Sequence, residues 1–266
     1  MSLSSINPSQ SASVPSVSAK AKHRYALLDE IRGFALVNMV VYHAVWDLVY
    51  LFGCDWNWYQ SGIAAFLWQQ MICWTFILLS GFCQPFGKHK LKRALFVLCS
   101  GFLVSFVTAF AQPQAQVRFG ILTMLGSCML IMIVLEQLFH RCRPIFGLAV
   151  GFFLFLLTQH IDLGYLGFGN RILVSLPLSW YRNDFTAYLG FPNPSFSSAD
   201  YFPLLPWFFL FLSGYFLHRL FLQKDWMKYL QTGRIKPLIW CGRHSLPIYL
   251  LHQPVLFVLL TAFFSL

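Results

Sequence analysis

Four ionisable side chains recur along one face of the first apolar stretch of the chain: Asp29, Arg32, His43 and Asp47. A helix turns about 100° and rises about 1.5 Å per residue, so Arg32 and His43 lie on one face, about 16 Å apart along the axis. Asp29 lies three residues before Arg32 and Asp47 lies four residues after His43, so both carboxylates share that face. Ionisable groups are costly inside a bilayer and indicate function there. The spacing predicts a cation near one membrane surface and, deeper in, an imidazole–carboxylate pair formed by His43 and Asp47.

A second polar stripe occurs near the end of the chain, in CGRHSLPIYLLHQPV. Ser245, Tyr249 and His252 are four and three residues apart, so they share a helix face. Pro247 and Pro254 each lack an N–H and leave a carbonyl free one turn earlier, and irregular backbone at membrane depth lines cavities or is buried in protein. The polar residues of this stripe are Arg243, His244, Ser245, Tyr249, His252 and Gln253.

Both stripes also have an interpretation without chemistry. Arg32 could reach the membrane surface from a helix end, and His43 and His252 could bond to neighbouring helices. Asp200, which precedes a later apolar run, is expected at the outer membrane edge and is a further candidate to contact substrate.

The composition is that of a membrane protein. Of 266 residues, 58% are hydrophobic and 11% are charged, whereas soluble domains average about 25% charged residues. The net charge of +10 comes from short loops between apolar runs, which indicates membrane topology and not nucleic-acid binding. None of the seven cysteines forms a CxxC pair, so neither a disulfide framework nor a metal site is expected. Nucleotide-hydrolase, zinc-protease and serine-hydrolase motifs do not occur.

Apolar runs near 20 residues, the length that a bilayer core of about 30 Å requires, predict an all-α, polytopic transmembrane helix bundle. The seven predicted spans cover about 27–52, 63–86, 94–111, 119–139, 145–161, 203–222 and 238–263. A short apolar piece around 172–178 predicts a re-entrant or surface helix. The Ser-rich residues 1–22 contain no acid and no apolar core, so a disordered tail is expected before one transmembrane domain at 23–266.

Positive charge predicts the orientation. Sixteen of the 19 Lys and Arg residues fall on one side when the N-terminal segment, 87–93, 140–144 and 219–243 share that side. Arg118, Arg171 and Arg182 remain on the other side. This bias predicts a cytoplasmic N-terminus and an outside C-terminus in the cell (inner) membrane.

Four separated motifs carry a family resemblance over about residues 24–260. RYALLDEIRGFALVNMVVYH resembles the opening of the integral-membrane acyltransferase superfamily, whose first span carries Arg, ten residues and then His, as Arg32 and His43 do. FGILTMLGS at 119–127, DYFPLLPWFFLFLSGYFL at 200–217 and CGRHSLPIYLLHQPV at 241–255 resemble, more specifically, the heparan-α-glucosaminide N-acetyltransferase catalytic-domain family. The lysosomal type has its proposed catalytic His in the loop after the first span, and 54–62 contains no His, so the catalytic assignment falls on His43.

The resemblance implies a membrane-bound acyltransferase that moves an acetyl or short acyl group from cytosolic acetyl-CoA to an amine or hydroxyl of a sugar or envelope glycan. Such transfer needs a base and a stabiliser for the oxyanion. His43 and Asp47 are the expected base and its orienter, with His252 as a second base or oxyanion donor. The expected donor-binding residues are Arg32, Arg243, His244 and Ser245, and the expected acceptor-binding residues are Tyr249, Gln253 and Asp200.

The expected partners are acyl-CoA, a glycan acceptor and the bilayer, with no metal and no nucleic acid; a homodimer is retained as a candidate assembly. Two other classes fit the same polar stripes. One is a transporter or flippase for a lipid-linked glycan, which would use the polar groups without chemistry. The other is a haem-b protein, with His43 and His252 as axial ligands.

Overall fold

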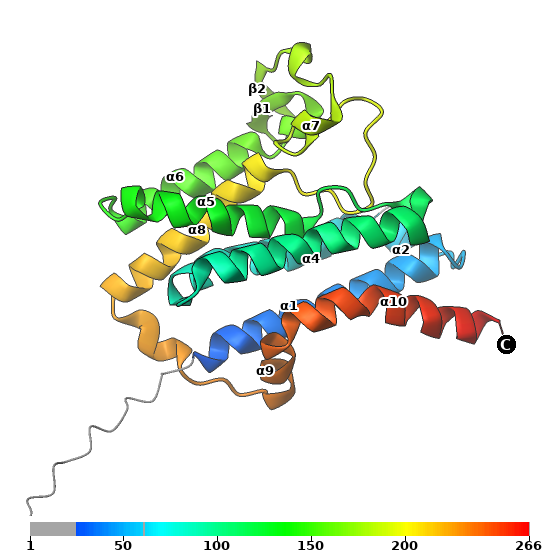
Figure 1. The fold of residues 1–266 in the computed structure, drawn as a ribbon, viewed down its shortest axis with the longest axis horizontal. Helices are drawn as coiled ribbons and strands as arrows, with labels where there is room; N and C mark the ends of the chain where they lie inside the picture. Colours follow the sequence, from blue (N-terminus) through cyan, green and yellow to red (C-terminus); the bar gives the residue numbers. More distant parts are fainter. Residues whose placement is uncertain (1–24, 61, 266) are drawn as a thin grey trace, which may run out of the picture.

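The computed structural model describes residues 25–60 and 62–265, so the predicted tail at 1–22 lies outside the described residues. Seven helices in this part are long and apolar enough to cross a bilayer, which confirms the all-α bundle of about seven spans. They are α1 (Ala26–Tyr50), α3 (Ile63–Cys83), α4 (Lys90–Ala111), α5 (Ile121–Phe139), α6 (Pro144–Thr158), α8 (Leu204–Gln223) and α10 (Ser245–Phe264). The spans that contain α3 and α6 continue through short 3-10 turns to Phe86 and Leu163. In Figure 1, α1 and α10 run along the lower side of the bundle above α9, α6 lies at the upper left, and α8 runs from the upper middle down to the left.

Shorter elements connect these spans. The helical ones are α2 (Asn57–Gln60), η1 (Gln84–Phe86), η2 (Pro113–Ala115), η3 (Ile161–Leu163), η4 (Leu178–Trp180), α7 (Asp184–Ala187), η5 (Trp226–Leu230) and α9 (Lys236–Arg243). The two strands are β1 (Tyr165–Phe168) and β2 (Arg171–Ser175), which pair antiparallel.

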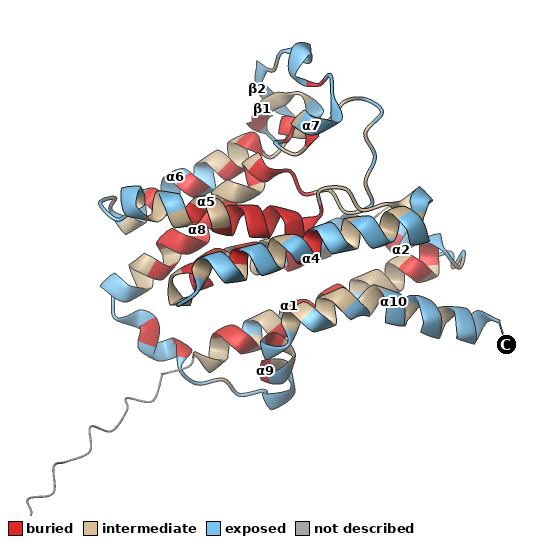
Figure 2. Cartoon of the chain, in the orientation of Figure 1, coloured by how far each residue is buried: buried red, intermediate tan, exposed pale blue. Residues whose placement is uncertain are grey.

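The core of the bundle lies where α5 and α8 meet α3 and α6. Figure 2 shows buried residues along α5 and α8, while the outer half of α10 is exposed. The largest fully buried side chains include Phe155, Phe211, Phe216, Met124 and Met132. Because the exposed side chains of α4 and α10 are largely apolar, these two helices have faces suited to lipid.

Two glycines bring α9 into backbone contact with α1. A Cβ on Gly33 would lie 1.9 Å from the Leu238 carbonyl oxygen, and one on Gly242 would lie 1.8 Å from the Asp29 carbonyl oxygen. Any side chain at either position would therefore force the two helices apart. This close approach holds the end of α9 beside the first turns of α1.

From there α10 runs parallel to α1. Arg243 contacts Asp29 near the start of α1, the His252 ring lies next to the His43 ring, and Phe264 stacks on Phe52 beyond the end of α1. The first and seventh of seven consecutive spans must cross a membrane in the same direction. The parallel pair is consistent with that parity.

The predicted seventh span, about 238–263, is wrong at its start. The chain breaks at His244 (φ −106°, ψ 26°), which separates α9 from α10. Pro247 has no N–H to donate to the Arg243 carbonyl, and its ring disfavours a continuous helix at that carbonyl. The break is what allows α9 to lie against α1.

The helix predicted around 172–178 is also wrong. Strand β2 covers most of this piece, and Gly169 and Asn170 form its two-residue connection to β1. Gly169 has φ +55°, a left-handed conformation that hairpin turns of this length require. A short apolar run does not by itself distinguish a strand from a helix.

Candidate active site

The parallel helices α1 and α10 bring the two predicted stripes together. The ring centroids of His43 and His252 lie 4.9 Å apart, and those of Tyr249 and His252 lie 5.4 Å apart. The two candidate catalytic histidines therefore come from different ends of the sequence and occupy one place in the bundle.

Asp47 is fully buried, and its bonded partner differs from the one predicted. Gln253 Nε2 donates to Asp47 Oδ1 at 2.8 Å. The described residues show no hydrogen bond between His43 and Asp47, and the role of Asp47 as the orienter of His43 stays a prediction. An amide always offers an N–H, whereas a neutral imidazole offers one only from the correct nitrogen.

Three polar atoms at this place are buried without a hydrogen-bond partner in the described part of the chain. They are His252 Nε2, Asp47 Oδ2 and Gln253 Oε1. A buried acceptor without a donor costs about 1–3 kcal/mol, so each such atom requires an explanation. Asp47 lies on α1, and His252 and Gln253 lie on the facing helix α10, so unused hydrogen-bonding capacity is gathered between these two helices.

The His252 ring has a defined tautomer. Its Nδ1 lies 2.5 Å from the Tyr249 carbonyl oxygen, and a carbonyl oxygen can only accept. In the neutral imidazole, Nδ1 therefore carries the hydrogen, and Nε2 keeps the lone pair. The unpartnered Nε2 is thus able to accept a proton.

Asp200 joins this site from the loop before α8. The Tyr249 hydroxyl lies within hydrogen-bonding range of its carboxyl group, and the Ile121 backbone N–H donates to Asp200 Oδ2 at 3.3 Å. Burial raises the pKa of Asp200 to about 6. The three predicted acceptor-binding residues, Tyr249, Gln253 and Asp200, thus all adjoin the histidine pair or its immediate neighbours.

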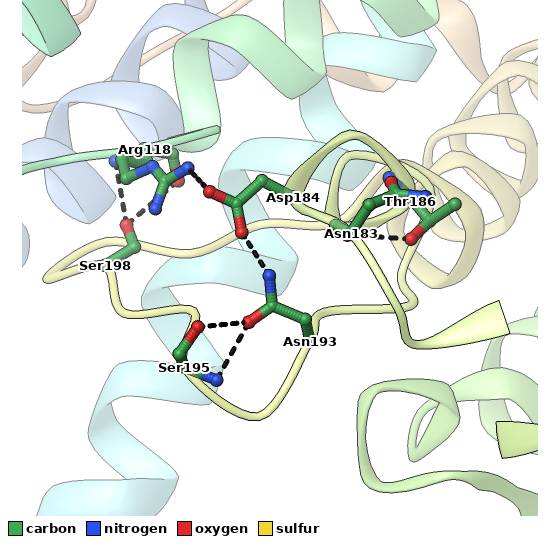
Figure 3. A network of polar contacts seen from close by, with 7 residues as sticks. All are labelled: Arg118, Asn183, Asp184, Thr186, Asn193, Ser195 and Ser198. Atoms are coloured by element: carbon green, nitrogen blue, oxygen red, sulfur yellow. Dashed lines mark hydrogen bonds and ion pairs between the residues drawn. The ribbon is translucent and has the colours of Figure 1, made fainter. Parts of the chain in front are cut away.

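A polar network fixes the loop that carries Asp200 (Figure 3). Arg118 forms an ion pair with Asp184, and Asn193 donates to the same carboxylate. The Ser198 hydroxyl accepts from the Arg118 backbone N–H and donates to the Arg118 carbonyl, each at 2.9 Å. The Arg118 guanidinium holds the pKa of Asp184 below its usual range. The network ties 183–198 to the segment that enters α5.

At the other end of α1, the predicted donor-binding arginines converge on one carboxylate. Arg32 Nη1 lies 3.3 Å from Asp29 Oδ1, and Arg243 Nε lies 3.5 Å from Asp29 Oδ2. The break at His244 places Arg243 there, because α9 ends beside the first turns of α1. We call the place where Arg32, Asp29 and Arg243 meet the arginine end.

His244 and Ser245 do not join these contacts. His244 is exposed, its Nδ1 lies 2.9 Å from the Trp240 carbonyl oxygen, and its ring packs on Trp240. Ser245 is half-buried at the start of α10. The role of both residues in donor binding stays a prediction.

Two residues near these places were not singled out by the sequence. Tyr59, on α2, is buried with its ring against Tyr42, one residue before His43. Arg93, on α4, donates from Nη1 to the Cys83 carbonyl at 3.4 Å, and Arg32 Nη2 contacts Cys83 Sγ at 3.2 Å. In the sequence, Tyr59 was one of several loop aromatics and Arg93 one of many loop cations, so neither stood out.

A protein-family model described as heparan-alpha-glucosaminide N-acetyltransferase, catalytic, matches residues 24–254. This range includes both the arginine end and the histidine pair. No curated protein and no solved structure matches the chain.

Proposed function

The chain belongs to the heparan-alpha-glucosaminide N-acetyltransferase catalytic family, and we propose that it transfers an acetyl or short acyl group from acyl-CoA to an amine or hydroxyl of a sugar or envelope glycan. Family membership and the seven apolar helices support a multi-pass membrane protein with an acetyltransferase-like role. The donor, the acceptor and the residue roles are proposed from the geometry at the two ends of α1.

One observation carries the proposal. His252 Nε2, Asp47 Oδ2 and Gln253 Oε1 are buried, lack partners within the described residues and come from facing helices beside His43. Packing alone would favour pairing these atoms, because unpaired buried acceptors destabilise a fold. A bound sugar carries several amine or hydroxyl hydrogen atoms, so one acceptor molecule can donate to all three.

We assign His252 as the general base. Its Nε2 accepts the proton of the acceptor amine or hydroxyl as that group attacks the thioester carbonyl carbon. A C–N or C–O bond forms, the C–S bond breaks, and the proton passes to the departing thiolate, so that CoA leaves as a thiol. His43, across from His252, donates an N–H to the carbonyl oxygen as negative charge develops. These assignments exchange the roles that the sequence alone suggested for the two histidines.

The donor is proposed to enter at the arginine end. Arg32 and Arg243 suit the phosphate groups of acyl-CoA, because guanidinium groups bind phosphate through paired hydrogen bonds. Along α1, Arg32 and His43 are about 16 Å apart, a distance that an extended pantetheine arm can bridge. The polyanionic part of the donor therefore stays at the membrane edge while its acyl group reaches the histidine pair.

The acceptor is proposed to approach from the opposite end, where Asp200 and Tyr249 meet. A carboxylate and a phenol hydroxyl bind amino and hydroxyl groups of sugars directly. Gln253 is on the same helix as Tyr249, donates to Asp47 from Nε2, and has a buried Oε1 without a partner among the described residues, which we assign to the acceptor.

The test uses purified full-length protein with labelled acetyl-CoA. Binding and slow hydrolysis are expected without an acceptor. His252→Ala and His43→Ala should keep the donor affinity and lower turnover, because base catalysis supplies about 10²–10⁴-fold. His160→Ala, whose ring packs on Tyr165 away from the site, is the control. A wild-type protein that binds no acetyl-CoA would instead favour transport of a lipid-linked glycan.

The haem alternative is not supported by the geometry. Two axial imidazoles must leave space for the iron and its macrocycle between them. The His43 and His252 centroids are only 4.9 Å apart, with the rings inclined at 55°. Absorption of the purified protein in the Soret region would contradict this argument.

A further inference from the structure

Arg93 is a half-buried cation whose hydrogen-bonding capacity is mostly unused. Its contact within the described residues is one long bond, from Nη1 to the Cys83 carbonyl at 3.4 Å. Arg219 on α8 contrasts with it, because that side chain donates to the carbonyls of Phe139, His140 and Cys142. A guanidinium carries five N–H donors, and donors that lose water without gaining a partner are unfavourable. Arg93 therefore lacks acceptors where Arg219 has them.

A second cation, Arg32, contacts the same residue, Cys83, as Arg93 does. Arg32 Nη2 is 3.2 Å from Cys83 Sγ, so Cys83 contacts both guanidinium groups. Asp29 already contacts Arg32 and Arg243, and among the described residues no carboxylate lies within ion-pair distance of Arg93. Two like charges at this buried residue repel each other, and an anion bound by both would offset that repulsion.

The local backbone also favours an anion. Arg93 lies in the first turn of α4, which is a 22-residue helix without a side-chain cap at its start. Positive side chains near this positive end of the helix dipole are unfavourable, whereas a negative ligand is favoured there. Gly87, in the turn before α4, has no side chain to cover Arg93, since a Cβ there would lie 3.8 Å from Nη1.

We propose that Arg93 and Arg32 together bind a phosphate group of the acyl donor at the turn between α3 and α4. Arg93 then provides the N–H donors that lack acceptors, and Arg32 connects the site to Asp29 and, through Asp29, to Arg243. This assignment deepens the proposed function and rests on it for the identity of the donor. The alternative is that Arg93 only contributes to membrane orientation.

The test compares Arg93→Gln with Lys92→Gln, a matched control. Lys92 is the preceding residue, is exposed and carries the same charge, so both variants remove one positive charge from the same turn. Acetyl-CoA affinity should fall about ten- to hundredfold in Arg93→Gln and stay at the wild-type value in Lys92→Gln. S-acetylpantetheine lacks the phosphates of the nucleotide, and its affinity should be equal in all three proteins.

Arg93→Lys provides the conservative variant. It should recover part of the acetyl-CoA affinity, because a charge remains but the planar fork is lost. It also supplies the measurement if Arg93→Gln does not fold. Equal acetyl-CoA affinity in the wild type and Arg93→Gln would overturn the phosphate site and leave the acyltransferase proposal intact. The same conclusion would follow if Arg93→Gln lost as much affinity for S-acetylpantetheine as for acetyl-CoA.

Inorganic pyrophosphate tests phosphate binding at this site independently of acetyl transfer. It should raise the thermal unfolding midpoint of the wild type and Lys92→Gln, and not that of Arg93→Gln. This result, combined with absent acetyl transfer, would keep the phosphate site and refute the acyltransferase. A wild type that responds to neither pyrophosphate nor acetyl-CoA would overturn the site.

Discussion

Asp47 illustrates what spacing can and cannot predict for a single residue. Its charge inside an apolar helix marked it as functional, and the structure places it beside the histidine pair. Its partner, Gln253, lies 206 residues later in the sequence, on a helix that only tertiary packing brings close. The spacing rule favoured His43, because residues four apart on a helix are neighbours. Which neighbour bonds depends on the donors that a second helix presents.

The Asp47–Gln253 bond can be tested by a double-mutant cycle. Gln253→Ala leaves the buried Asp47 carboxyl without its donor, and should cost about 1–3 kcal/mol of unfolding free energy. Asp47→Ala should cost a similar amount, and the double variant less than the sum, with a coupling of about 0.5–3 kcal/mol. Thermal unfolding of the four proteins measures this coupling. Additive losses would show that the two side chains do not interact.

Asp200 gives a prediction for the dependence of stability on pH. Burial raises its pKa from 3.8 to about 6, so the folded protein holds the proton more tightly than the unfolded chain does. The resulting stabilisation is complete below pH 3.8 and is lost as the pH rises through about 6. The wild type should therefore lose stability relative to Asp200→Asn as the pH rises from about 4 to about 7. Unfolding midpoints measured side by side cancel the other titrations.

Asp184→Asn is the control of opposite sign. Its hydrogen bond to Arg118 lowers the pKa of Asp184, so its contribution is present at neutral pH and is lost on acidification. The stability of the wild type should therefore increase relative to that of Asp184→Asn as the pH rises. A wild-type advantage over Asp200→Asn that is constant with pH would contradict the assignment of a raised pKa to Asp200.

At the scale of elements, apolar run length predicted the seven long helices, because the bilayer requires about 20 apolar residues per span. Apolar run length gave the wrong element where a run contained a helix break, as at 238–263, or was short, as at 172–178. The break at His244 had a signal in Pro247, and the hairpin had one in the Gly169–Asn170 pair between two apolar runs. Hydropathy records neither signal. The break matters most for the site, since it places Arg243 beside Asp29.

The contact between α9 and α1 predicts a specific effect of Gly242→Ala. The added Cβ would lie 1.8 Å from the Asp29 carbonyl oxygen, so α9 must move and carry Arg243 away from Asp29. Both stability and donor affinity should fall. Gly214→Ala is matched to it, because its Cβ would lie 2.1 Å from the Leu78 carbonyl oxygen at the interface of α3 and α8. That variant should lose stability but keep the donor affinity, and an equal loss of affinity in both would contradict the role of α9.

At the scale of the whole molecule, the structure separates two polar places along α1. The arginine end lies at its start, and the histidine pair lies toward its other end, next to the loop that carries Asp200. The sequence predicted this separation because helix rise converts residue number into depth. It could not predict which helices close around each place, since the contacts of Arg93 with Cys83 and of Tyr249 with Asp200 depend on side-chain packing between distant segments.

The orientation of the bundle in the membrane is the last prediction. The charge bias predicts that the N-terminus and the arginine end face the cytoplasm, where acyl-CoA is available, and that the loop 163–202 faces outside. Seven spans, with α10 parallel to α1, then place the C-terminus outside. Reporter fusions after Lys90, after Phe196 and after Leu266 should report inside, outside and outside. A fusion after Leu266 that reports the same side as Lys90 would contradict the count of seven. A full inversion of all three would keep the fold but place the arginine end away from the cytosolic donor, and the donor site would then need another ligand.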